Sequence, residues 1–332
     1  MIVRTLPFAL LALVLLVPLG VEGQEATTEL YGDFRYSYNR VDAGAATYWT
    51  GVNNASRLGV RSEAAAGSLT LFADLQAGAG VDGGGSAFTP RYYLAGVRGE
   101  FGTLTVGRHS PAYKMAGVRL DPFYDTSTLG TGGGVPTEGV FGGASFGLSS
   151  LTNGWADRTV AWSSPAFGGF TANAAAYVDP DSDHDYGLGI GYRAGGLEVG
   201  VQYHDVGGGP GWAQSSGIEH AFRTHASLAR DAWSVGASHE RVAASEGEDQ
   251  TFFLALGTVH VTPDVMFAAS VGHVGDGSVQ DAAGTGYHLG VFYRLLPQAR
   301  VHALYSGLDP DGGPSRGNLA VGLTYQFTLG SS

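Results

Sequence analysis

Cysteine, charge and lysine are all scarce in this 332-residue chain. The absence of cysteine excludes a disulfide framework, a thiol nucleophile and cysteine-ligated metal. Only 14% of the residues are charged, the formal net charge is −12, and Lys114 is the single lysine. Nucleic-acid binding requires clustered basic residues that neutralise phosphates, so we expect no nucleic-acid partner.

Long hydrophobic runs are also lacking, apart from one near the N-terminus. Arg4 precedes an apolar run from Leu6 to Leu19, and small residues follow it. This run is shorter than the roughly 20 residues that a membrane-spanning helix needs. A basic start, a short apolar stretch and small residues before a cleavage point are typical of a secretory signal. We therefore expect residues 1–23 to be a cleaved signal peptide and 24–332 to be one exported domain without a helical anchor.

The residues that are abundant favour strands at a membrane. The chain has 54 glycines and 16 tyrosines. Glycine weakens helices. Tyrosine has an apolar ring and a polar tip, which suits the interface between membrane and water.

A period of two dominates the chain from about residue 28 onward. In segment 30–39, even positions such as Phe34 and Tyr38 are apolar or aromatic, whereas odd positions such as Asp33 and Asn39 are polar. Such alternation places one face of a strand in an apolar medium and the other in a polar one. The same alternation returns in segments 197–204, 288–295 and 319–327.

Connections between the predicted strands alternate between short and long. Short turns are predicted at 64–67, 99–102, 194–196, 230–231, 262–264 and 296–299. Longer connections, rich in Gly, Asp and Pro, are predicted at 41–55, 79–90, 206–220, 275–286 and 308–317. Short turns at one rim, long loops at the other and an even count of about sixteen strands are typical of an outer-membrane barrel. Closure also removes the unpaired strand edges that lipid would not tolerate. We therefore predict an all-β fold, a transmembrane antiparallel β-barrel of about 16 strands.

One connection differs from the others in length. About fifty residues, from 109 to 157, follow the fifth predicted strand and show little alternation. Loops of this length in a compact domain are usually functional or disordered.

Six segments spread over the mature chain also carry a resemblance to a known family. They are TELYGDFR (28–35), ASRLGVRSE (55–63), GEFGTLTVGR (99–108), LDPF (120–123), SSPAFGGF (163–170) and VGLTYQF (321–327). In order and spacing they resemble the Gram-negative general porins, which are trimeric sixteen-stranded outer-membrane channels. The chain departs from this family in having Ala161 and Ser163 where relatives carry basic residues, and in continuing beyond Phe327.

The resemblance implies that the third loop, about 109–157, folds into the barrel and narrows the pore. It assigns Arg57 and Arg108 to a basic wall of this constriction. On the loop it points to Asp121 as the facing carboxylate, with Asp125 and Glu138 behind it. Fixed charges of opposite sign across a narrow pore produce a transverse field that acts on passing solutes.

Three further arginines are candidates for the same wall. The inward phase of their strands directs Arg35, Arg61 and Arg91 toward the lumen. Arginine stays charged at every relevant pH. These residues can therefore contribute to the constriction or simply pair with acids along a wide lumen.

The expected function is that of a passive porin, a water-filled channel for ions and small hydrophilic solutes. The resemblance implies a homotrimer in the outer membrane, surrounded by lipid and lipopolysaccharide, with no cofactor. Two alternatives remain open, a substrate-specific channel and a non-conducting barrel that serves adhesion or envelope structure.

Enzymatic activity is not expected. Alternation sends the sequence neighbours His204 and Asp205 to opposite faces of a strand, and the same holds for His239 and Glu240. The chain also contains no G-x-S-x-G, H-E-x-x-H or phosphate-loop motif.

A cluster of aspartates is the only weak candidate for a metal site. Four aspartates alternate in a predicted external loop, and oxygen-rich clusters can hold Ca²⁺. The bidentate glutamate of an EF-hand is missing, which favours a solvated acidic loop tip. The candidate ligands are Asp179, Asp181, Asp183 and Asp185.

Overall fold

The computed structural model describes most of the mature chain. It covers residues 26–81, 87–126, 147–149, 151, 154–178, 184–206, 217–279 and 283–331. The expected signal peptide, residues 1–23, lies outside the described residues and stays a prediction.

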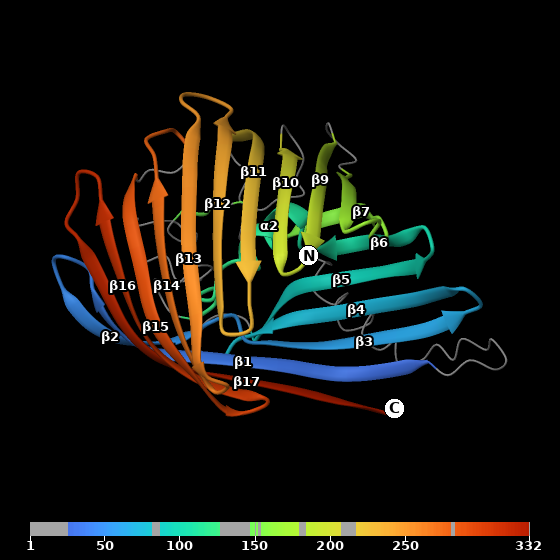
Figure 1. Ribbon diagram of the computed structural model, residues 1–332, viewed down its shortest axis with the longest axis horizontal. Helices are drawn as coiled ribbons and strands as arrows, with labels where there is room; N and C mark the ends of the chain where they lie inside the picture. The colour runs from blue at the N-terminus through green and yellow to red at the C-terminus, as the bar shows by residue number, and fades with distance from the viewer. Residues whose placement is uncertain are drawn as a thin grey trace, which may run out of the picture.

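The described residues form one antiparallel sheet that closes on itself, because β1 pairs with both β17 and the β2–β3 pair (Figure 1). Strands that follow one another in sequence lie side by side around the barrel. The elements are β1 (Thr27–Asp42), β2 (Thr47–Asn53), β3 (Arg57–Ala66), β4 (Leu69–Ala79), β5 (Phe88–Gly99), β6 (Gly102–His109), α2 (Ala112–Val118), β7 (Ala156–Ser163), β8 (Phe170–Tyr177), β9 (Asp185–Ala194), β10 (Leu197–Asp205), β11 (Ile218–Ala229), β12 (Trp233–Ala244), β13 (Gln250–Thr262), β14 (Val265–Val274), β15 (Gly284–Leu296), β16 (Ala299–Pro310) and β17 (Arg316–Ser331).

Two of these strands share one place in the barrel. β2 pairs with the C-terminal part of β1 and β3 with its N-terminal part, so both lie along the same neighbour. Between them Ala55 adopts a left-handed backbone with φ 62°, which interrupts the strand. The barrel therefore has sixteen strand positions, as the sequence predicts.

Two predicted loops are shorter than expected. The predicted connection 41–55 is wrong, because β1 continues to Asp42 and β2 already begins at Thr47. The residues Tyr48 to Thr50 are aromatic or β-branched and pair with β1, which extends the hairpin. Likewise, β16 and β17 extend into the predicted connection 308–317 and leave only residues 311–315 between them.

The sheet is apolar outside and polar inside, the reverse of a water-soluble protein. On β1, Phe34 and Tyr38 are 37% and 57% exposed, whereas Asp33 and Asn39 are 8% and 0% exposed. β17 repeats the pattern, with exposed Val321. An exposed apolar band on every side requires an apolar solvent, so the outer face matches lipid. Among the described residues, no helix is long and apolar enough to cross a membrane.

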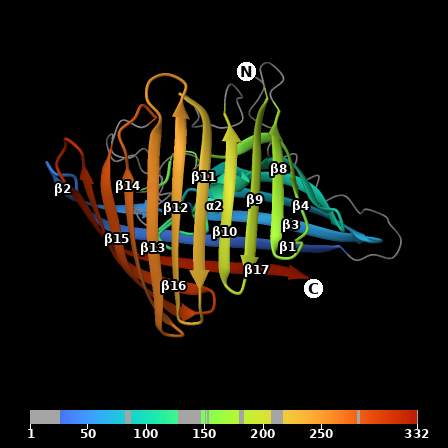
Figure 2. The same ribbon diagram turned by 45° about the horizontal axis from the view of Figure 1, so that its top comes forward.

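The long connection between β6 and β7 enters the barrel. Its seven-residue helix α2 contacts β9, β10 and β11 and is drawn inside the barrel wall (Figures 1 and 2). Tyr113 of α2 is packed among buried side chains such as Val242 and Phe252. Phe123, farther along the loop, is packed against Phe292 and Leu304. The described part of the third loop is therefore folded inward, as expected, and packs against the β10–β16 side of the lumen.

Candidate functional site

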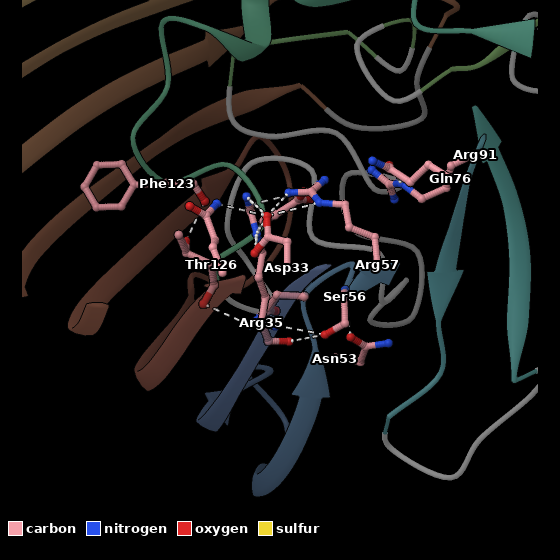
Figure 3. Close-up of polar contacts among 12 residues, drawn as sticks. Asp33, Arg35, Asn53, Ser56, Arg57, Gln76, Arg91, Phe123 and Thr126 are labelled. Atoms are coloured by element: carbon pink, nitrogen blue, oxygen red, sulfur yellow. Dashed lines mark hydrogen bonds and ion pairs between the residues drawn. The ribbon is translucent and has the colours of Figure 1, made fainter. Parts of the chain in front are cut away.

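A buried carboxylate on β1 organises the inner wall of the barrel. Asp33 and Arg35 are two residues apart and share the inward face, so their side chains meet. Arg35 Nη2 lies 2.6 Å from Asp33 Oδ2. Arg57 is the cross-strand partner of Asp33 on β3, and its Nη2 donates to the same oxygen at 2.7 Å. Figure 3 shows both guanidinium groups converging on Asp33.

The break between β2 and β3 fixes this arrangement. Ser56 Oγ accepts a hydrogen bond from the backbone N–H of Arg35 at 2.9 Å and donates to its carbonyl at 3.1 Å. Asn53 Oδ1 in turn accepts the N–H of Ser56 at 3.0 Å. The interruption at Ala55 thus replaces missing ladder hydrogen bonds with side-chain ones and holds Arg57 at the start of a new strand.

The loop brings a second carboxylate to the same two arginines. Asp125 Oδ2 lies 3.5 Å from Arg35 Nη1 and 3.6 Å from Arg57 Nη1. Asp125 has a left-handed backbone with φ 56°. Aspartate tolerates this conformation better than most residues. Burial raises the pKa of Asp125, and the facing arginines oppose that rise.

A further cluster of cations lies beside this pair. A β-bulge in β5 makes Arg91 the extra residue opposite Gln76, and Arg91 Nε donates to Gln76 Oε1 at 2.9 Å. The guanidinium of Arg91 lies 4.6 Å from the ring centre of Trp155. The ammonium of Lys114 lies 4.0 Å from the same ring. Burial and the neighbouring Arg91 lower the pKa of Lys114 to about 7.

Polar contacts hold the loop after Asp125. The carbonyl of Thr126 accepts hydrogen bonds from Asn54 Nδ2 at 3.2 Å and from His302 Nε2 at 2.9 Å. Asn54 also donates to Ser37 Oγ at 2.9 Å. The loop is therefore tied to β1, to the β2–β3 break and to β16 at one point.

The opposite wall holds the loop by a fully buried ion pair. Arg223 of β11 and Glu240 of β12 are both 0% exposed and form an ion pair. Arg223 Nη1 also donates to the carbonyl of Tyr113, whose hydroxyl donates to Glu240 Oε2 at 3.0 Å. Gly117 allows this approach, because a Cβ there would lie 2.5 Å from Arg223 Nη1. We call Tyr113, Arg223 and Glu240 with Ser149, which also donates to Glu240, the loop latch.

The structure brings three of the five predicted arginines together. Arg35, Arg57 and Arg91 lie around Asp125 and Lys114. Arg108 lies on the same side, close enough to Lys114 to act on its charge, and its Nη1 donates to Asp157 at 2.6 Å.

Arg61 does not join this group. Its Nε donates to Glu29 Oε2 at 2.6 Å, and its side chain is 52% exposed. Arg61 follows Arg57 by four residues on β3, so its cross-strand partner on β1 is Glu29 rather than Asp33. Inward positions recur every second residue along a strand, which gives both arginines the same direction but different partners.

The predicted loop carboxylates are only partly accounted for. Asp125 faces the arginines, whereas Asp121 is buried and accepts the N–H of Phe123 at 2.9 Å. Burial raises the pKa of Asp121 to about 7. Asp121 thus acts on the loop backbone and is not paired with an arginine among the described residues. Glu138 lies outside the described residues.

The suggested calcium site receives no support from the described part of the chain. Asp185 is the first residue of β9, where it pairs with Tyr177 and is buried, so its placement in the loop tip was wrong. The hairpin continues farther than the sequence indicates. Asp179, Asp181 and Asp183 lie outside the described residues. No group of metal-ligating side chains occurs among the residues that are described.

Sequence reasoning missed three members of the site. Asp33 had a signal, because it shares the inward face with Arg35 at a spacing of two. Lys114 and Trp155 had none, because their meeting depends on how the loop folds back onto the β5 wall. Together these residues place four cations, Arg35, Arg57, Arg91 and Lys114, around two paired carboxylates, Asp33 and Asp125. A narrow lumen with such fixed charges orients and selects solutes without binding them tightly.

Comparisons with known proteins agree with the barrel fold. A search of curated proteins finds no matching sequence. The fold matches an anion-selective porin from Comamonas acidovorans with a TM-score of 0.75 at 17% identity, covering 91% of this chain and 100% of that one. It matches the trimer form of OmpT from Vibrio cholerae with a TM-score of 0.65 at 18% identity, covering 91% and 99%.

A third solved structure and a family model complete the comparison. Salmonella typhi OmpF in complex with daunomycin matches with a TM-score of 0.62 at 14% identity, covering 90% of this chain and 97% of that one. These identities are low and show a shared fold. The model of the Gram-negative porins matches residues 9–313, which is most of the sequence. With its sixteen strand positions and its inward loop, the chain therefore belongs to the Gram-negative porin family.

Proposed function

We propose that this protein is a passive, water-filled channel for ions and small hydrophilic solutes and that it prefers anions. Its family and fold support an outer-membrane channel for solutes. The preference is inferred from the constriction, where Arg35, Arg57, Arg91 and Lys114 outnumber Asp33 and Asp125.

The physical basis is an excess of fixed positive charge. Asp33 and Asp125 together balance Arg35 and Arg57, which share them. The excess comes from Arg91, whose Nε donates to the neutral Gln76, and from Lys114 over the ring of Trp155. Uncompensated charge along a narrow aqueous path raises the local concentration of counter-ions and lowers that of co-ions. Anions should therefore cross more readily than cations of equal size.

Planar-bilayer recordings of the purified protein test the proposal. In a KCl gradient we expect stepwise conductance and a reversal potential displaced toward that of chloride. A reversal potential on the potassium side would overturn the anion preference. Silent membranes would instead favour a non-conducting structural barrel, and current blocked by a particular solute would favour a specific channel.

Assembly and export extend the same proposal. We infer a homotrimer embedded in outer-membrane lipid and lipopolysaccharide, since a similar fold, OmpT of Vibrio cholerae, is described in a trimer form. We also infer cleavage of the signal before Gln24. Light scattering of the detergent-solubilised protein and sequencing of its mature N-terminus test these two points, and a monomer or an intact residue 1 would contradict them.

A further inference from the structure

A second polar cavity lies inside the barrel on the short-turn side of the loop. It has a volume of about 610 Å³ and lies between α2 and the inner wall of β4 to β11. Its lining includes Ser164 and Gly169 of the short β7–β8 turn and Arg193 near the β9–β10 turn. This volume is typical of small-molecule sites, which occupy about 300–1,000 Å³. We call it the lower chamber.

The charges that line the lower chamber are unbalanced. Glu198 is the only carboxylate among the described lining residues, and Arg193 Nε donates to it at 3.1 Å. Arg119, the C-cap residue directly after α2, also lines the chamber. Arg119 forms no ion pair with any described residue. The chamber thus offers one guanidinium whose charge no described carboxylate compensates.

Polar side chains from β10 and β11 line the same chamber. Gln202 of β10 is 7% exposed and presents its amide to the lining. His225 of β11 lines the same chamber, and its buried Nδ1 has no hydrogen-bond partner in the described part of the chain. Buried polar groups are normally satisfied, so such groups around a cavity indicate a ligand or ordered water.

One part of the chamber wall is apolar. Met115, Ala112 and Ala116 present one side of α2, and Phe72 and Leu94 face it from β4 and β5. Burying a hydrocarbon group against apolar surface of this kind is favourable, because both are removed from water. Inorganic phosphate or a sugar would make no use of it.

We propose that the lower chamber binds small monocarboxylates with a short aliphatic or aromatic body during their passage. The carboxylate is held by Arg119 with Gln202 as a hydrogen-bond donor, and the hydrocarbon body lies against Met115. This site rests on the proposed channel function and supplies it with a class of preferred solutes.

Block of single-channel chloride current by benzoate tests the site in the full-length protein. We expect millimolar benzoate, added from the short-turn side at constant KCl, to reduce the current, and equal amounts of phosphate or glucose to have no such effect. Arg119→Gln should raise the half-blocking concentration about tenfold, because a hydrogen bond to a charged group is lost. Arg119→Lys should retain the block.

Matched variants separate the site from general effects of charge. Arg294→Gln removes an arginine that pairs with Asp264 at a short turn outside the chamber, and it should leave the block unchanged. Met115→Ser should weaken the block by benzoate through loss of apolar contact. Folding of each variant is checked by its heat-shifted mobility on gels.

Three results would overturn the inference. They are a conducting channel without benzoate block, a block that Arg119→Gln and Met115→Ser both leave intact, and an equal block by phosphate, which would show recognition of charge alone. In each case the channel function would stand. A folded protein that does not conduct at all would instead refute the proposed function and the site together.

Discussion

The two halves of the inner wall contact the loop in different ways. On the β1–β5 side, Arg35, Arg57 and Arg91 face the loop through ion pairs and aromatic contacts and keep partial access to water. On the β10–β16 side, the loop latch and the packing of Phe123 against Phe292 are fully buried. The β1–β5 side, which we call the charged half, therefore forms the charged surface of the pore. The β10–β16 side holds the loop through contacts that are buried from water.

This division explains how a constriction can be both charged and rigid. On the charged wall, the loop is held by the contacts of Asp125 with two arginines and of Thr126 with Asn54. Packing and a buried ion pair on the far wall supply further anchorage, because their loss leaves a cavity or an unpaired charge. Asp125 can then be held at 3.5 Å and 3.6 Å from two arginines without closing on either.

Breaking the loop latch should have the largest effect. Arg223→Met leaves Glu240 buried without its cation, which typically costs about 3–5 kcal/mol. We expect a lower unfolding temperature in detergent and noisier, larger single-channel currents as α2 detaches. The double variant Arg223→Met/Glu240→Leu removes both charges and should recover much of the stability. A double variant less stable than Arg223→Met alone would contradict the role of the pair.

Removing the second attachment should have a somewhat smaller effect. Phe123→Ala empties a fully buried site between β14, β15 and β16 and should cost on the order of 3 kcal/mol. Because Asp125 is two residues away, its contacts with Arg35 and Arg57 should loosen too. We expect a rise in conductance together with altered selectivity, whereas Phe123→Leu should change both only slightly. Unchanged conductance in Phe123→Ala would show that the loop end is held by Thr126 alone.

On the charged half, Arg57→Gln should change selectivity more than stability. A unit charge roughly 8 Å from the ion path in water is worth about 0.5 kcal/mol, with opposite sign for anions and cations. The anion-to-cation permeability ratio should therefore fall about fivefold. Reversal potentials in a KCl gradient measure it. Arg61→Gln, which removes an exposed arginine paired with Glu29, is the matched control and should shift the potential little.

The two halves also differ in how much of each could be predicted from the sequence. Strand residues such as Asp33, Arg35 and Arg57 follow a strict period of two, so their inward direction can be read from the chain. The loop latch could not be predicted, because Tyr113 and Glu240 are 127 positions apart and meet only after the loop folds inward. The same holds for Lys114 and Trp155. The β2–β3 break was missed because one left-handed residue, Ala55, leaves no periodic signal.

The smallest effect we predict is a pH dependence of the selectivity. Lys114 and Asp121 both lie on the loop, and each has a pKa shifted to about 7 by burial. Above pH 7 Lys114 loses its positive charge and Asp121 gains a negative one, so both changes lower the net positive charge of the constriction. Anion preference should therefore be strongest near pH 5.5 and decline toward pH 8.5.

The size of this decline follows from the burial of the two groups. Lys114 and Asp121 are only 4% and 6% exposed and lie farther from the water path than the wall arginines. At twice the separation assumed for Arg57, each charge changes the permeability ratio by about twofold. Lys114→Arg keeps the charge at all pH values and should remove about half of the pH dependence, and Asp121→Asn should remove the other half. If the double variant Lys114→Arg/Asp121→Asn still followed the wild-type pH profile, groups on the charged half or outside the barrel would have to be responsible instead.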